Sequence, residues 1–329
     1  MPRDEFVWIN KQRPSKYFDS HIIEGIGDDT AVYSSSDDFD ELLCVDTLIE
    51  DIHFKKSTMA PEDIGHKALA VNISDIAAMG GIPTYYMVAI AVPTTWSDDE
   101  LEGIYRGMTE LGIRYKMDMI GGDTVSSPRG LMISVTVRGK VEKGRALLRK
   151  NAKPGDLVFL TNTTGRSAAG LSLLLDKGRH GRFSMQESEL VQTHQRPEPR
   201  VQEGRAAAKI DPLISLNDIS DGLASELNEL AEASNTSIEL WETHIPIAKE
   251  LKNFPEKNYW DWIFYGGEDF ELVGTVRESD WPILENEIEK TESQLYVIGR
   301  VLEGNPLVTL LGEKRKTILE KKGYNHFKQ

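Results

Sequence analysis

The order of hydrophobic and polar positions along the chain predicts alternating strands and helices. Short apolar runs rich in β-branched and aromatic residues are typical of strands, and they lie at residues 42–45, 85–92, 131–137, 157–161, 270–276 and 295–301. Apolar residues that recur every three or four positions predict helices, here at residues 61–78, 98–115, 167–175 and 222–233. This alternation favours an α/β or mixed α+β fold.

The length and the turn signals predict two domains. A chain of 329 residues is typical of two domains of ordinary size. A first unit ends near residue 140, after the strand predicted at 131–137, and a Lys-Pro-Gly-Asp turn at 153–156 opens a second unit. We therefore predict an N-terminal domain at 1–140 and a C-terminal domain at 141–329, joined through residues 141–150.

Composition and charge restrict the class of protein. The net charge is −15, from 53 acidic and 38 basic residues, and such a surface repels nucleic acid. No stretch reaches the roughly 18 apolar residues needed to span a membrane, and the N-terminus lacks the apolar core of a signal peptide. Cys44 is the single cysteine, which excludes an internal disulfide and fits a reducing compartment. We therefore expect a cytoplasmic protein with no membrane or nucleic-acid partner.

The most informative acids lie beside glycines or inside apolar sequence. Taken singly, each has an ordinary explanation, such as a turn or the cap of the helix that begins near Gly222. Asp75 is harder to explain, because its helix is mostly apolar and a buried unpaired carboxylate is costly. Asp46 raises the same question at the end of an apolar strand. Six stretches share this character: GIGDD with Asp29, CVDT with Asp46, VNISDI with Asp75, IGGDT with Asp123, NDISDG with Asp218 and Asp221, and GGEDF with Glu268.

Considered together, these stretches predict carboxylates that converge on hard cations. Oxygen ligands suit Mg²⁺ better than zinc, and the histidines show no zinc-binding spacing. Glycines beside the acids allow a phosphate to approach the backbone. The pattern is typical of a nucleotide site in which metal ions neutralise the phosphates. The sequence has no P-loop, protein-kinase catalytic loop, dinucleotide fingerprint or Gly-x-Ser-x-Gly motif.

The same stretches, in this order, resemble the thiamine-monophosphate kinase family, a branch of the aminoimidazole ribonucleotide synthetase-like ATP-binding superfamily. The resemblance runs from about residue 25 to 327, and its most specific parts are DTLIEDIHF, KALAVNISDIAAMGG, GGEDFEL and the terminal KGYNHF. It implies a two-domain α/β subunit whose N-terminal domain pairs with a second copy as a barrel-like homodimer, with ATP near the interface. We expect the strand at 131–137 to be an edge strand that this pairing covers. The resemblance also implies an ATP-dependent transfer that converts thiamine monophosphate to thiamine diphosphate.

The resemblance assigns roles to individual residues. Metal ligands carry over to Asp29, Asp46, Asp75, Asp123, Asp218 and Asp221. ATP contacts carry over to Tyr105, Gly122, Asp123, Arg149 and Ser220, and thiamine-phosphate contacts to His53, Glu268 and Tyr324. Simpler explanations compete for four of these: a surface position for His53, a surface ion pair for Arg149, helix packing for Tyr105 and a tail position for Tyr324. Val45 and Asp51 depart from residues that are frequent in the family.

The acceptor chemistry predicts a simple mechanism. A phosphate monoester is mostly dianionic at neutral pH, since its second pKa is about 6, so no general base or covalent nucleophile is expected. Alignment and charge neutralisation by Mg²⁺ then suffice for direct in-line transfer. Two alternatives stay open: another ATP-dependent synthetase of the superfamily, and a non-enzymatic metal-binding protein on this fold. We also expect the C-terminal tail, with Tyr324, to close the acceptor pocket.

Overall fold

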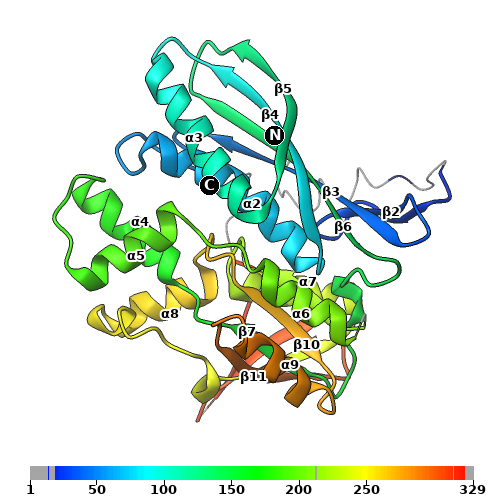
Figure 1. The fold of residues 1–329 in the computed structure, drawn as a ribbon. Coiled ribbons are helices and arrows are strands. Elements are labelled where there is room, and N and C mark those ends of the chain that lie inside the picture. Colours follow the sequence, from blue (N-terminus) through cyan, green and yellow to red (C-terminus); the bar gives the residue numbers. More distant parts are fainter. Residues whose placement is uncertain (1–13, 15–18, 212, 314, 323–329) are drawn as a thin grey trace.

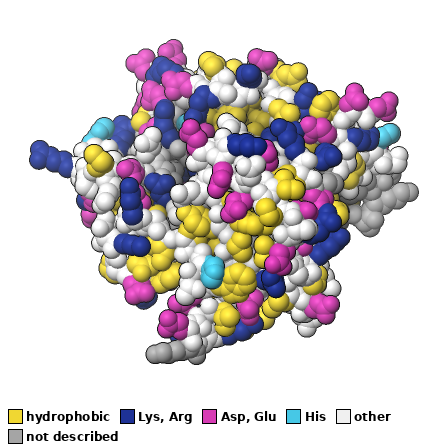
Figure 2. Space-filling view, turned by 60° about the horizontal axis from the view of Figure 1, so that its bottom comes forward, with side chains coloured by type: hydrophobic (Ala, Val, Ile, Leu, Met, Phe, Trp, Pro, Cys, Tyr) yellow, Lys and Arg dark blue, Asp and Glu magenta, His cyan; other side chains and the backbone are white. Residues whose placement is uncertain are grey.

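The protein folds into two layered units that meet along helix α2 (Figure 1). The structure, a computed structural model, describes residues 14, 19–211, 213–313 and 315–322. The tail residue Tyr324 therefore lies outside the described residues. Within the described part of the chain, no helix is long and apolar enough to cross a membrane. On the face shown in Figure 2, acidic and basic side chains are interspersed and no single basic patch dominates.

The N-terminal unit is a sheet covered on one face by two helices. Among the described residues the sheet has six strands in the order β1-β2-β3-β6-β4-β5, and only β4 and β5 pair in parallel. Helices α2 and α3 pack on its inner face. The elements are β1 (Ile22–Glu24), β2 (Ala31–Ser34), β3 (Phe39–Ile49), α2 (Pro61–Ala78), β4 (Ile82–Val92), α3 (Asp98–Tyr115), β5 (Asp118–Ser126) and β6 (Met132–Glu142).

Local sequence explains how the two helices begin and why they pack closely. Pro61 stands at the start of α2, where its missing N–H costs nothing. Ser97 and Glu100 form a capping box at the start of α3. A Cβ atom on Gly65 would lie 1.8 Å from the carbonyl oxygen of Ile104, so only glycine permits this approach of α2 to α3.

The C-terminal unit is a second sheet with helices on both faces. Its described strands follow the order β13-β12-β9-β11-β7-β10-β8, and only β12 and β9 pair in parallel. The strands are β7 (Leu157–Thr161), β8 (Ser215–Asp218), β9 (Ser237–Trp241), β10 (Leu272–Val276), β11 (Leu295–Leu302), β12 (Leu307–Leu311) and β13 (Lys316–Ile318). The helices are α4 (Arg166–Lys177), α5 (Met185–Gln195), α6 (Val201–Ile210), α7 (Leu223–Ser234), α8 (Glu256–Tyr265) and α9 (Trp281–Glu289). Short 3₁₀ turns lie at Arg149–Asn151, Glu242–His244 and Leu251–Asn253.

Strand β7 shows how the two faces of one sheet pack into two separate cores. Side chains alternate across a strand. Val158 and Leu160 pack with α4, α7 and α8, whereas Leu157 and Phe159 pack with α6 and α9. Because both faces are covered, every residue of β7 is buried and the strand appears in the sequence as a continuous apolar run.

Helix α2 joins the two units. It contacts the N-terminal sheet on one side and α6 and β8 on the other. A Cβ atom on Gly204 would lie 2.0 Å from the carbonyl oxygen of Ala77, so α6 also crosses α2 closely. Two polar side chains of α2, Lys67 and Ser74, point into the junction between the units, where they contact Glu268 and Asp218.

Most of the predicted elements are confirmed, and two details are wrong. The helices predicted at 61–78 and 98–115 and the strand at 157–161 have the same bounds in the structure. Asp46 was expected to close its strand, but β3 continues to Ile49 because it pairs with β6 over its whole length. Residues 131–137 were expected at a sheet edge, yet β6 lies between β3 and β4, and β1 and β5 are the outer strands of the described sheet. Alternation reports which face of a strand is buried and says nothing about its neighbours.

Candidate active site

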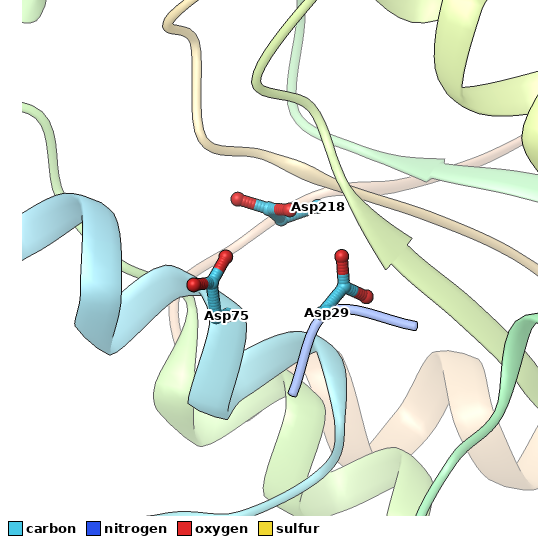
Figure 3. A group of neighbouring side chains, drawn as sticks. All are labelled: Asp29, Asp75 and Asp218. Carbon is cyan, nitrogen blue, oxygen red and sulfur yellow. The ribbon is translucent and has the colours of Figure 1, made fainter. Parts of the chain in front are cut away.

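Three aspartates from distant parts of the sequence meet at the junction of the two units. Asp29 lies in the loop between β1 and β2, Asp75 in the last turn of α2, and Asp218 at the end of β8. One carboxylate oxygen of each lies within 4.8 Å of the others. Figure 3 shows the three carboxyl groups pointing toward one another. The cap explanation for Asp218 and Asp221 does not hold, since the N-cap residue of α7 is Gly222 and no side chain caps this helix.

The cluster is electrostatically unfavourable without a cation. Burial and the charge of Asp29 raise the pKa of Asp218 to about 8. Burial and the charge of Asp46 raise the pKa of Asp75 well above its usual range. Ser74 Oγ donates a hydrogen bond of 2.6 Å to Asp218, but the buried Oδ2 of Asp29 has no hydrogen-bond partner among the described residues. Buried carboxylate oxygens that lie close together and lack hydrogen-bond donors are suited to bind a hard divalent cation.

Arg149 is the basic residue that contacts this cluster. Its guanidinium forms ion pairs with Asp29 and with Glu229 of α7, and its Nε donates to Asn217 at 3.1 Å. Its backbone N–H donates to Asp28 at 3.1 Å. The alternative prediction, a surface ion pair for Arg149, is wrong, because this residue lies against the buried carboxylates.

A pocket of about 550 Å³ opens beside the cluster. The predicted residues that line it are Asp46, His53, Asp75, Ser220, Asp221 and Glu268. Backbone geometry holds two of them: His53 Nδ1 accepts from the N–H of Ile49 at 3.0 Å, and the N–H of Glu268 donates to Ser220 at 2.7 Å. Predicted metal ligands and predicted acceptor contacts thus share one cavity.

Three other predicted residues lie away from this pocket within one chain. Gly122 and Asp123 belong to the outer strand β5, which is exposed along its whole length. The register Asp46–Val135–Val88–Gly122 crosses three strand spacings, or roughly 14 Å at the usual strand separation. Tyr105 lies on α3 and packs, partly buried, against the N-terminal core. The packing explanation for Tyr105 therefore matches its position in one chain.

The structure also places residues at the site that the sequence did not single out. Lys67 on α2 forms an ion pair with Glu268, and Glu229 on α7 forms one with Arg149. Asp51 has a φ of 68° in the loop before His53, a backbone conformation that glycine adopts most easily. Lys67 could have been noticed as a lysine within a mostly apolar helix. The sequence around Glu229 has no comparable feature.

Comparisons with known proteins identify the family. The model of the AIR synthase related protein N-terminal domain matches residues 27–141, and that of the corresponding C-terminal domain matches 153–310. The thiamine-monophosphate kinase of Bacillus subtilis is 50% identical over 326 residues, which is 99% of this chain and 100% of that protein. A solved structure of AaThiL complexed with AMPPCP and TMP is 34% identical, with a TM-score of 0.81 over 92% of each chain.

A crystal structure of thiamine-monophosphate kinase from Stenotrophomonas maltophilia is 32% identical, with a TM-score of 0.79 over 90% of this chain and 93% of that one. The likeness in sequence and in fold spans both units and includes the segments that carry the aspartate cluster. The chain belongs to the thiamine-monophosphate kinase family.

Proposed function

We propose that the chain transfers the γ-phosphoryl group of ATP to thiamine monophosphate and so forms thiamine diphosphate. The observation that carries this proposal is a pocket that lies beside the aspartate cluster. Asp75 of the cluster lines this pocket together with His53 and Glu268. The family relationship supports the substrate pair, because a relative of the same fold is known complexed with AMPPCP and TMP. The prediction of a cytoplasmic protein accompanies this proposal.

The chemistry of the donor set supports Mg²⁺ as the metal. Asp29, Asp75 and Asp218 offer carboxylate oxygens within 4.8 Å of one another, with no nitrogen or sulfur ligand in the group. Asp46 and Asp221 line the adjoining pocket and are the further candidate ligands. When bound, Mg²⁺ supplies charge that offsets the repulsion between the donor and acceptor phosphates.

The remaining groups hold and align the reactants. We assign to Arg149 a contact with the ATP phosphates, because its guanidinium lies against Asp29 and adds a fixed positive charge. Ser220 precedes Asp221 in the same loop, and we assign its hydroxyl group to a contact with phosphate. Glu268 places a carboxylate where the cationic thiazolium ring of the acceptor can bind. The acceptor phosphate is itself the nucleophile, so the transfer proceeds in line without a base from the protein.

A homodimer through the N-terminal sheet completes the proposal. The outer face of this sheet exposes Val45 (60%), Met87 (44%) and Val125 (51%), which lie on three different strands. An exposed apolar face of this kind marks an interaction surface. Pairing two copies there covers these side chains and places Gly122 and Asp123 at the interface. We propose that both residues contact ATP, with Tyr105 on α3 nearby, in that assembly.

One assay tests the activity and the competing functions. ADP release is measured with and without thiamine monophosphate, and with the acceptors of other superfamily synthetases. The proposal expects release that depends on thiamine monophosphate and on Mg²⁺. Release with a different acceptor favours another synthetase, and Mg²⁺ binding without turnover favours a non-enzymatic protein. A chiral γ-thiophosphate donor tests in-line transfer, since one displacement inverts phosphorus and a phosphoenzyme route retains its configuration.

A further inference from the structure

Lys67 is a fully buried cation in the wall of the acceptor pocket. It lies on α2 with an exposed fraction of 0%. Its Nζ atom donates to Glu268 Oε2 at 2.8 Å and lies 3.5 Å from His194 Nε2. Burial of an ammonium group is costly unless an anion and hydrogen bonds compensate it. The mechanism described above gives Lys67 no role, so its position needs a separate explanation.

The hydrogen-bond pattern shows what Lys67 does to its neighbours. An ammonium group can only donate, so His194 Nε2 must accept and the ring hydrogen lies on Nδ1. Nδ1 then donates to Ser167 Oγ at 3.1 Å. Burial and the charge of Lys67 lower the pKa of His194 to about 3, so the ring is neutral. Among the described residues, Glu268 is therefore the one anion that pairs with Lys67.

Glu268, His194 and Ser167 line the pocket, and of these three Glu268 exposes the largest fraction of its side chain. Its side chain keeps 29% of its surface exposed, whereas Lys67 and Ser167 have none and His194 has 2%. Its backbone has a φ of 65°, which is strained for a residue other than glycine. Surrounding contacts must therefore hold Glu268 in this conformation if its carboxylate is to have a defined position. Lys67 supplies such a contact from the opposite unit of the protein.

We propose that Lys67 is a positioning residue that fixes the Glu268 carboxylate at the acceptor end of the pocket, against the cationic heterocycle of the acceptor. Lys67 does not line the cavity, so it acts through the side chains that it contacts, and Glu268 is the charged one among them. The pair also joins α2 to the loop before β10, so the acceptor site forms only when the two units are docked. This inference rests on the proposed function.

A double-mutant cycle on the acceptor KM tests the inference. Lys67→Met keeps the volume of the side chain and removes its charge, and Glu268→Gln removes the partner's charge. We expect Lys67→Met to raise the KM for thiamine monophosphate at least tenfold and to leave the KM for ATP within twofold. In the Glu268→Gln background the same change should raise the acceptor KM no further than twofold. Multiplying effects in the double variant would overturn the proposal, because Lys67 would then act by another route.

Two controls keep the outcome unambiguous. Lys67→Met alone leaves the Glu268 carboxylate without its charged partner and can fail to fold. In that event the comparison of Glu268→Gln with Lys67→Met/Glu268→Gln decides: equal acceptor KM values support the proposal, and a tenfold difference overturns it. Asp63→Asn, one turn earlier on α2, breaks the inter-unit pair with Arg196 (2.7 Å) outside the pocket, and both KM values should stay unchanged. A wild-type enzyme that does not use thiamine monophosphate refutes the proposed function instead.

Discussion

Replacing Asp218 by asparagine should stabilise the metal-free protein and remove its response to Mg²⁺. The substitution neutralises one member of the cluster formed with Asp29 and Asp75. Asparagine keeps a side-chain oxygen that can accept the hydrogen bond from Ser74. The change therefore removes charge from the site while the packing around it is preserved.

The magnitude follows from the distances in the cluster. Two carboxylates 4.8 Å apart repel each other by about 3 kcal/mol at an effective dielectric constant of about 20. For a cooperative chain of 329 residues, relief of one such repulsion raises Tm by about 4 °C. The gain is an upper value, since protons on the cluster already relieve part of the repulsion in the wild type.

The pH dependence has a defined sign. The folded pKa of Asp218 is about 8 against a usual value of 3.8, so the folded state binds more protons than the unfolded state between these values. The free energy of unfolding of the metal-free wild type must therefore fall as pH rises through this window. The stabilising effect of Asp218→Asn should be largest near pH 8 and should vanish near pH 4.

Thermal unfolding with EDTA and with Mg²⁺, at pH 6 and pH 8, measures both effects. The wild type should gain stability on addition of Mg²⁺ in proportion to the logarithm of one plus the ratio of the Mg²⁺ concentration to Kd, and Asp218→Asn should gain little. Asp156→Asn is the matched control, because burial also raises the pKa of Asp156 but it lies outside the cluster, where it accepts from the N–H of Lys153. A variant that melts below the wild type in EDTA at pH 8, and still responds fully to Mg²⁺, would refute the assignment of Asp218.

Three further predictions test other parts of the site. Arg149→Met should lower kcat/KM for ATP on the order of 100-fold, about the loss of one strong charged contact, and steady-state kinetics showing an unchanged value would remove Arg149 from the ATP site. Met87→Lys places a charge on the exposed apolar sheet face and should shift sedimentation toward monomer, whereas an unchanged dimer would exclude this face. Tyr324→Ala should raise the KM for thiamine monophosphate about tenfold, since a cation–π or stacking contact contributes roughly 1–2 kcal/mol, with no change for ATP. A lower Tm with both KM values unchanged would instead make Tyr324 an anchor of the tail.

The sequence predicted what depends on local pattern. Helices α2 and α3 have their predicted bounds because Pro61 and the Ser97 capping box mark their starts, and a mostly apolar pattern in α2 and an amphipathic one in α3 continue to their ends. The cluster could be predicted because Asp75 had no local partner in an apolar helix. Strand β5 was missed, since its Gly-Gly-Asp centre is typical of a turn and its exposed residues show no buried alternation. Its place at the outside of the sheet is decided by pairing with β4.

Contacts between distant parts of the chain were beyond prediction from one sequence. Lys67 and Glu268 lie 201 positions apart, and Arg149 and Glu229 lie 80 apart. Neither pair has a spacing that local geometry imposes. Each pair forms only because folding brings distant segments together. Lys67 on α2 meets the loop before β10, and Arg149 meets α7.

Helix α2 gives these contacts a common geometry. Asp63, Lys67 and Ser74 recur at intervals of four and seven residues, so they lie on one face of the helix, toward the C-terminal unit. They pair there with Arg196, Glu268 and Asp218, respectively. At a rise of 1.5 Å per residue, Lys67 and Ser74 are separated by about 10 Å along the axis. A single rigid helix therefore fixes the distance between the acceptor end of the pocket and its metal end. Because α2 is covered on both sides, neither end can shift relative to the other without disturbing a core.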